Sequence, residues 1–153
     1  MPRAIVALLA GAIAIGLNMG ALAAADLVPL ATAHGGLFRL IVVLSGGTRH
    51  LPSGPLVQPV FHVLVGLLMA EFYAFVLQPV VVGPSWWRGL LYAAAVWLAN
   101  AAIVLPIIGE GFAGSRHLAL AGMIWFAAAH TVFFVALAVI YDGLRQAERW
   151  IRP

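Results

Sequence analysis

The sequence predicts an all-α membrane protein: four transmembrane helices that form a bundle, in a single domain over residues 1–153. Composition is the first reason. Of the 153 residues, 64% are hydrophobic and 8% are charged, with a mean hydropathy of +1.06, whereas a soluble domain carries about 25% charged residues. The second reason is the presence of four long apolar stretches. About twenty residues at about 1.5 Å each cross the hydrocarbon core of a bilayer, and the predicted helices cover residues 4–29, 56–77, 88–108 and 118–141.

The basic residues are eight arginines dispersed along the chain, and the net charge is +3. This pattern is typical of membrane-flanking charge and lacks the concentrated basic patch of a nucleic-acid-binding surface. We therefore expect membrane lipids and other integral membrane subunits, or further copies of this chain, as partners, and no nucleic acid. The sequence contains no cysteine, which excludes disulfides and thiolate metal sites.

The first apolar stretch is open to two interpretations. Residues 1–25 carry one arginine, an apolar run and Ala-Leu-Ala before Asp26, as a secretory signal peptide would. The apolar run is longer than the roughly 7–15 residues of such a signal, however. We therefore predict a membrane helix that ends near Pro29.

The segment between the first two helices is too short to cross a membrane. Within residues 30–58, about ten apolar residues lie between two glycine pairs and are interrupted by Arg39. We predict an interfacial or re-entrant segment that packs at the mouth of the bundle.

The second and third helices are separated by a turn at residues 78–85 that is rich in proline and glycine, which commonly end helices. Trp86 and Trp87 follow the turn, and indole rings are enriched at the level of the lipid headgroups. The third helix contains Asn100 and Pro106 within its apolar run.

The fourth helix is followed by an amphipathic tail over residues 142–153. Leu144, Ala147 and Ile151 recur at three- and four-residue spacing among charged residues. The pattern predicts a short helix on the membrane surface with Trp150 as its interfacial anchor.

Arginine positions predict the orientation in the membrane. Five arginines lie on the side of the termini and three on the other side, so the positive-inside rule places both termini in the cytoplasm. The absence of lysine and the many alanines and glycines indicate a GC-rich bacterial genome, so we expect the bacterial inner (cytoplasmic) membrane. The five are Arg3, Arg88, Arg145, Arg149 and Arg152, and the three are Arg39, Arg49 and Arg116.

The chain contains an internal repeat. Two short segments match, GTRHL at residues 47–51 and GSRHL at residues 114–118. An offset of 68 residues then relates two pairs that are each eleven residues apart, His62 with Tyr73 and His130 with Tyr141. We infer a duplicated helical hairpin in parallel orientation, an arrangement that is known in membrane transport folds.

The repeat predicts a polar layer inside the membrane. His62 and His130 should lie at the same depth and face each other, because a histidine that faces lipid loses its hydrogen bonds. Asn18 and Asn100 should lie at about the same level, since each is some fourteen residues into its helix. A second, outer layer would contain Arg49, His50, Arg116 and His117 at the membrane surface.

Several residues share a pattern with a known family. They are His62, Gly66, Tyr73 and Ala74, then Gly89 with Trp97, Pro106 with Gly109, and His130 with Tyr141. In these residues the chain resembles a bacterial family of small four-helix membrane proteins that is known as a domain of unknown function. The resemblance covers residues 56–143 and implies the fold but no activity. The chain departs from the family at Glu71, where an apolar residue is usual, and at Val135 and Asp142, where glycine is often found.

His62 and His130 are candidate axial ligands of a b-type haem, which needs two imidazoles on opposed helices and small residues that admit the macrocycle. The alternative is that each histidine makes a hydrogen bond to a neighbouring helix. Without a cysteine or a carboxylate on the same face, the two histidines are too few for a metal ion of their own.

Glu71 lies nine residues after His62 and therefore on the opposite face of the second helix. A carboxyl group in the membrane is costly unless protein covers it. We therefore predict that Glu71 lies in an interface with protein. Trp86, Trp87 and Trp150 are the other candidate interface residues.

Three classes of function remain open. The first is a non-catalytic accessory subunit of a larger membrane complex, which we expect in respiratory or photosynthetic electron transfer. The alternatives are a small b-type cytochrome and a small oligomeric transporter or channel. We do not expect an enzyme, because Ser115 beside His117 in a loop is no evidence for a catalytic triad. Bound lipid is the expected ligand.

Overall fold

The computed structural model describes residues 1–28, 30–32, 36–47 and 54–151, and these residues contain helices and no strand. Four helical segments are long and apolar enough to cross a membrane, which confirms the predicted all-α class and the four spans. The spans are Arg3–Asp26 (α1), Val57–Val80, Ser85–Ile107 and Leu120–Trp150. The second consists of α3 (Val57–Phe72), η2 (Tyr73–Leu77) and α4 (Gln78–Val80), and the third of α5 (Ser85–Ala99), η3 (Asn100–Val104) and α6 (Leu105–Ile107).

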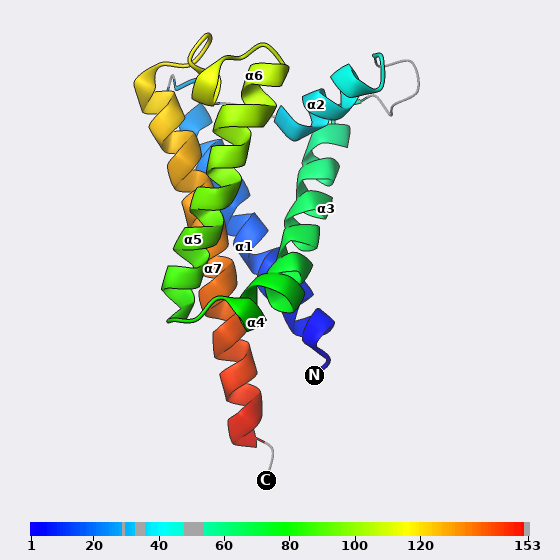
Figure 1. The fold of residues 1–153 in the computed structure, drawn as a ribbon, viewed down its shortest axis with the longest axis vertical. Helices are drawn as coiled ribbons and strands as arrows, with labels where there is room; N and C mark the ends of the chain where they lie inside the picture. The colour runs from blue at the N-terminus through cyan, green and yellow to red at the C-terminus, as the bar shows by residue number, and fades with distance from the viewer. Residues whose placement is uncertain (29, 33–35, 48–53, 152–153) are drawn as a thin grey trace.

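The four long helices alternate in direction, and both termini lie at the same end (Figure 1). The helix α7 (Leu120–Ile151) packs against α5 on one side and α1 on the other, and α1 also packs against α3. The order across the molecule is therefore α5, α7, α1, α3. The helices α3 and α5 contact each other near α4, where the Tyr92 hydroxyl donates a hydrogen bond to the Met69 carbonyl oxygen at 3.2 Å. Toward α2 and α6 these two helices diverge (Figure 1).

The core combines small residues with large aromatic ones. Buried alanines of α1 face the aromatic side chains of the other helices, and the rings of Tyr73 and Tyr141 meet edge to face at 5.6 Å. Tyr92 and Phe134 have ring centroids 4.3 Å apart. Lipid tails are as apolar as these side chains, so close packing has to supply the attraction between the helices.

Two glycines allow the close approaches. A Cβ atom on Gly89 of α5 would lie 2.7 Å from the Cα atom of Val135 in α7. A Cβ atom on Gly11 of α1 would lie 2.6 Å from the Cβ atom of Ala70 in α3. Small residues at such contacts bring the helix backbones together.

Two turns of π-helix, η2 and η3, interrupt the second and third spans, and each ends two residues before a proline. Pro79 and Pro106 lack the N–H group of a regular helix, and their rings crowd the carbonyl of residue i−4. A widened turn takes up this conflict without ending the helix. The predicted end of the second helix at residue 77 was therefore wrong, since the helix passes through Pro79 to Val80.

The short helix α2 (Gly36–Leu44) lies at the end of the molecule opposite the termini (Figure 1). The ring of Phe38 meets that of Phe61 in α3 at 5.3 Å. A Cβ atom on Gly36 would lie 3.4 Å from the Leu105 side chain. The helix therefore connects the two spans that diverge. Its nine residues are too few to cross a bilayer, and its depth in the membrane remains a prediction.

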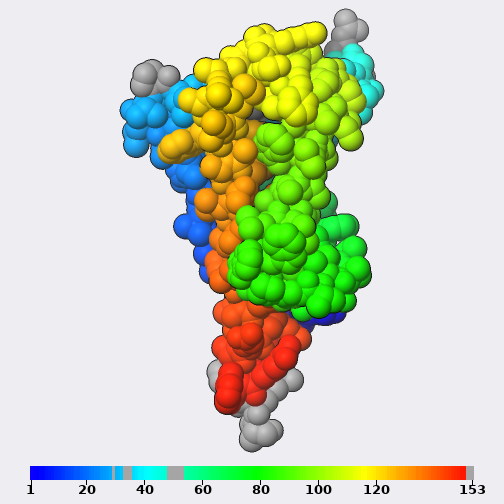
Figure 2. All heavy atoms as spheres, turned by 60° about the vertical axis from the view of Figure 1, so that its left-hand side comes forward, coloured from blue at the N-terminus to red at the C-terminus, as the bar shows by residue number. Residues whose placement is uncertain are grey.

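The C-terminal residues differ from the prediction. Residues 142–151 continue α7 as one helix and form no separate surface helix, and the end of α7 projects beyond the other helices (Figure 2). The N-terminal amino group forms an ion pair with Glu148. Glu148 also accepts a hydrogen bond from Arg145 at 3.1 Å. These contacts join the start of α1 to the last turns of α7.

Candidate functional site

Asn18 is the centre of the polar layer. Its side chain is 1% exposed, on α1 between α3 and α7. The Asn18 Oδ1 atom is 2.8 Å from His62 Nε2, and the Asn18 Nδ2 atom donates to the Ala129 carbonyl oxygen at 2.9 Å. One buried amide thus joins three transmembrane helices. Interhelical hydrogen bonds of this kind are the usual role of polar side chains in membrane helices.

His130 follows Ala129 directly, so it lies beside this connection. Its Nδ1 atom lies 2.9 Å from the Phe126 carbonyl oxygen of the same helix, and its ring packs on that of Phe126 at 4.2 Å. His62 and His130 are close enough to interact electrostatically. Asn100 instead donates to the Val96 carbonyl oxygen of its own helix at 3.1 Å. The structure therefore brings Asn18 and His62 into contact near His130, whereas the hydrogen bond of Asn100 is local.

These contacts bear on the fit of a haem between the two histidines. Axial ligation requires a free nitrogen on each imidazole, directed at the iron. The Nε2 atom of His62 is already hydrogen-bonded to Asn18. Ligation through this atom would break that bond and leave a buried amide oxygen without its donor. In the observed geometry the pair fits a structural role better than a bis-imidazole site. Among the described residues, imidazole and carboxylate groups form no cluster of three that could hold a metal ion.

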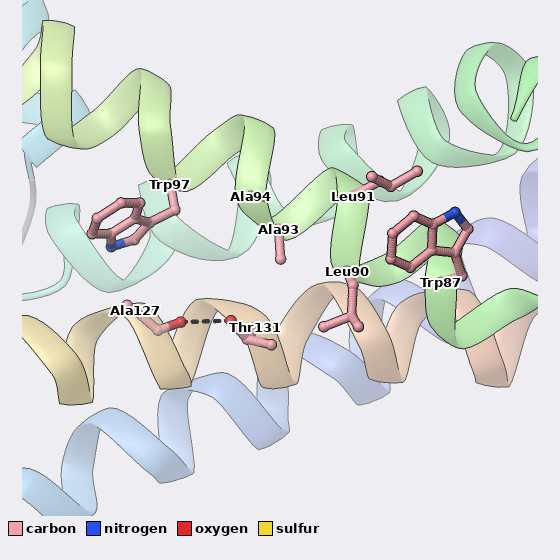
Figure 3. A pocket seen from close by; sticks show the side chains of 8 residues that line it. All are labelled: Trp87, Leu90, Leu91, Ala93, Ala94, Trp97, Ala127 and Thr131. Carbon is pink, nitrogen blue, oxygen red and sulfur yellow. Dashed lines mark hydrogen bonds between the residues drawn. The ribbon is translucent and has the colours of Figure 1, made fainter.

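A groove of about 480 Å³ lies on the outer side of α5 and α7. Trp87 and Trp97 lie at its two ends, and its floor is formed by small side chains of both helices (Figure 3). The Thr131 hydroxyl donates to the Ala127 carbonyl oxygen at 2.9 Å, so it is satisfied within α7. The remaining lining residues are Leu90, Leu91, Ala93 and Ala94. The groove is therefore almost entirely apolar.

The other predicted interface residues are dispersed. Glu71 on α3 is partly buried, and one of its carboxyl oxygens is buried and finds no hydrogen-bond partner among the described residues. Trp86 is exposed, and its ring meets that of Trp87 edge to face at 6.0 Å. Trp150 is 89% exposed near the end of α7. Whether these residues contact another protein remains a prediction.

A charged cluster around Glu110 lies at the α2 end. The Glu110 carboxylate accepts hydrogen bonds from Arg39 of α2 and from His117 Nδ1, the latter at 2.6 Å. The hydrogen bond from Arg39 holds the pKa of Glu110 below its usual value. Arg116 donates to the Gly109 carbonyl oxygen at 3.2 Å. The predicted partners of this cluster, Arg49 and His50, lie outside the described residues.

A second charged cluster, at the end with the termini, was not predicted from the sequence. Arg88 at the start of α5 and Asp142 of α7 form an ion pair at 2.8 Å, and both side chains are more than four-fifths buried. Their pairing follows from the antiparallel packing of α5 on α7, which places the start of one helix beside the later turns of the other. To predict this pair from the sequence, one would have to know which residues of α5 lie beside which residues of α7.

Comparison with models of known protein families, with curated proteins and with solved structures finds no match for this chain.

Proposed function

We propose that this protein is a non-catalytic integral membrane subunit that binds a transmembrane helix of a larger complex in the groove between Trp87 and Trp97. The observation that carries the proposal is the floor of the groove, formed by Ala93 and Ala94 of α5 and Ala127 of α7. Small residues let a third helix approach the backbones closely, which is how helices associate in membranes. The two indole rings would bracket the bound helix.

In this proposal the protein belongs to an energy-converting complex in a bacterial inner membrane, and both of its termini lie in the cytoplasm. The proposal also includes a duplicated hairpin that forms a four-helix bundle. Two observations support duplication: the ring contact between Tyr73 and Tyr141, and the bonding of Asn18 both to His62 and to Ala129, which precedes His130.

Substitution of the groove floor tests the proposed association. Ala94→Leu would fill the groove, whereas Ala99→Leu adds the same volume to an exposed position of α5 outside the groove. After purification in mild detergent, we expect wild type and Ala99→Leu to retain a stoichiometric membrane partner and Ala94→Leu to lose it. Retention by both variants, or recovery of only copies of this chain, would contradict the proposal.

Cysteine labelling tests the orientation, because the natural chain has no cysteine. Ser115 is exposed at the α2 end, and Ser85 begins α5 at the end with the termini. We expect Ser115→Cys, and not Ser85→Cys, to react with an impermeant maleimide in intact cells. The opposite result would reverse the orientation.

The cytochrome alternative is less well supported, because His62 Nε2 is engaged by Asn18. A visible absorption spectrum of the purified protein tests it directly. The reference is a double variant, Asn18→Leu with His62→Leu, which cannot ligate haem through residue 62. We expect the wild type and this variant to show the same absorbance in the Soret region. A Soret band that is present in the wild type and absent from the variant would favour the cytochrome.

A further inference from the structure

A polar cavity of about 150 Å³ lies at the end of the molecule with the termini, among α1, α4, α5 and α7. It is well above the roughly 10–15 Å³ that one water molecule needs. Its lining contains four arginines and one carboxylate, together with three uncharged polar residues. The lining residues are Arg3, Gln78, Arg88, Tyr141, Asp142, Arg145, Gln146 and Arg149.

Positive charge exceeds negative charge around this cavity. Among the described residues that line the cavity, Asp142 is the one carboxylate, and it is paired with Arg88; Glu148, outside the lining, pairs with Arg145. Arg3 donates to the Gln78 side-chain oxygen at 2.9 Å, and its guanidinium lies 5.9 Å from the centre of the Phe75 ring. Neither contact supplies a negative charge to Arg3.

The cavity is also surrounded by donors that lack acceptors. The Nε atom of Arg88 and the hydroxyl of Tyr141 are both buried and have no hydrogen-bond partner among the residues that the structure describes. The hydroxyl of Tyr73, whose ring contacts that of Tyr141, is also buried and has no partner in the described part of the chain. A guanidinium group only donates, and a neutral phenol readily does so. Leaving such groups unpaired costs free energy, so the geometry calls for an added acceptor.

We propose that this cavity binds a phosphate group. Guanidinium groups match the geometry of phosphate oxygens and bind them through two parallel hydrogen bonds. A phosphate oxygen would accept from Arg88 and Tyr141, and its negative charge would balance Arg3 and Arg149. The cavity lies at an end of the transmembrane helices, where the phosphates of a phospholipid leaflet are found, and basic pockets between such helices bind lipid headgroups. A free phosphate from the aqueous side has the same chemistry.

The test uses the full chain in nanodiscs and a double variant, Arg3→Gln with Arg149→Gln. This variant leaves the Arg88–Asp142 pair intact. The control is Arg116→Gln, which removes an arginine from the opposite end of the molecule. In nanodiscs of phosphatidylcholine alone, inorganic phosphate is titrated and thermal unfolding is followed, because a ligand that binds the folded state raises its stability. In nanodiscs with added phosphatidylglycerol, native mass spectrometry counts the retained lipid.

We expect the wild type to bind at least one probe, the double variant to bind it about tenfold more weakly or worse, and Arg116→Gln to match the wild type. Retained phosphatidylglycerol without a response to inorganic phosphate would identify a lipid headgroup as the ligand, and a response to inorganic phosphate in phosphatidylcholine would identify a soluble anion. Absence of both in the wild type would overturn the proposal, as would equal losses in Arg116→Gln. If the double variant does not fold, Arg149→Gln alone replaces it, and binding of both probes equal to that of the wild type overturns the proposal.

Discussion

The two ends of the molecule use the same chemical groups in opposite ways. At the α2 end, one carboxylate, Glu110, accepts hydrogen bonds from Arg39 and His117, whose side chains are about half exposed and largely exposed. At the end with the termini, four arginines line a cavity whose described lining holds one carboxylate, and the Arg88–Asp142 pair is buried, although Arg145 also pairs with Glu148 outside the lining. In the cluster at the first end, the described carboxylate has two hydrogen-bond partners. The second is enclosed and short of acceptors, which is the property expected of a binding site.

The largest effect should come from Asp142→Asn. This change leaves the buried Arg88 guanidinium without its counter-charge, and breaking a buried pair in this way typically costs about 3–5 kcal/mol. We expect a corresponding loss in the free energy of unfolding, measured by denaturant titration in detergent. The double change Arg88→Met with Asp142→Leu should recover most of the loss. If Asp142→Asn lowers the free energy of unfolding by less than Glu110→Gln does, the two ends do not differ in the way described.

Gly89→Ala should have the next largest effect. Gly89 follows Arg88 and lies against the backbone of Val135 and Phe134, so an added Cβ atom has to push α5 away from α7. Overpacking of this kind costs about 1–3 kcal/mol. The matched control is Gly16→Ala on α1, where no atom of the described residues lies within 4 Å of the added Cβ atom. Equal unfolding free energies for the two variants would contradict the close approach.

Arg39→Gln should have a smaller effect, because Arg39 is about half exposed. Ion pairs between exposed side chains contribute about 0.2–1 kcal/mol. We expect little change in global stability but faster amide hydrogen exchange in α2, which loses its ionic contact with Glu110. Unchanged exchange in α2 would show that the contact between Phe38 and Phe61 alone holds this helix.

Acidification should have the smallest effect on stability, and this effect should be limited to the α2 end. The folded pKa of Glu110 is lowered by its hydrogen bond from Arg39, so its contribution to stability is fully present above the ordinary value of 4.5. It is lost as the pH falls below 4.5 and through the lowered pKa. Hydrogen exchange in α2 should therefore rise over this range in the wild type and stay flat in Glu110→Gln. A rise of equal size in both would assign the effect to another group.

The spans could be predicted because their signal is local. Hydropathy places all four within a few residues of the observed helices, except where the helix passes through Pro79 and where α7 continues past Tyr141. Proline was treated as a helix breaker, whereas a π-helical turn relieves its steric conflict. The tail was separated from α7 because its composition changes, although no residue there forces the backbone to turn.

The polar contacts could be predicted only in part. The common depth of His62 and Asn18 follows from counting residues along each helix, and the two side chains are indeed hydrogen-bonded. Asn100 was predicted at a comparable depth, but its side chain bonds within its own helix. The difference depends on which way each side chain points around its helix. The Arg88–Asp142 pair depends on the register between two helices, which periodicity within one helix does not contain.

The length of α7 has a consequence for the membrane itself. Its 32 residues extend about 48 Å, whereas the hydrocarbon core of a typical bilayer is about 30 Å thick. The surplus of about 18 Å carries the charged residues Arg145, Glu148 and Arg149 at one end. A thicker bilayer would have to submerge these charges or deform around them, at a cost that rises with each ångström of mismatch. The apolar part of α7, residues 120–141, is about 33 Å long, so the charged end that follows it sets an upper limit of about that size on the hydrocarbon thickness that suits this protein.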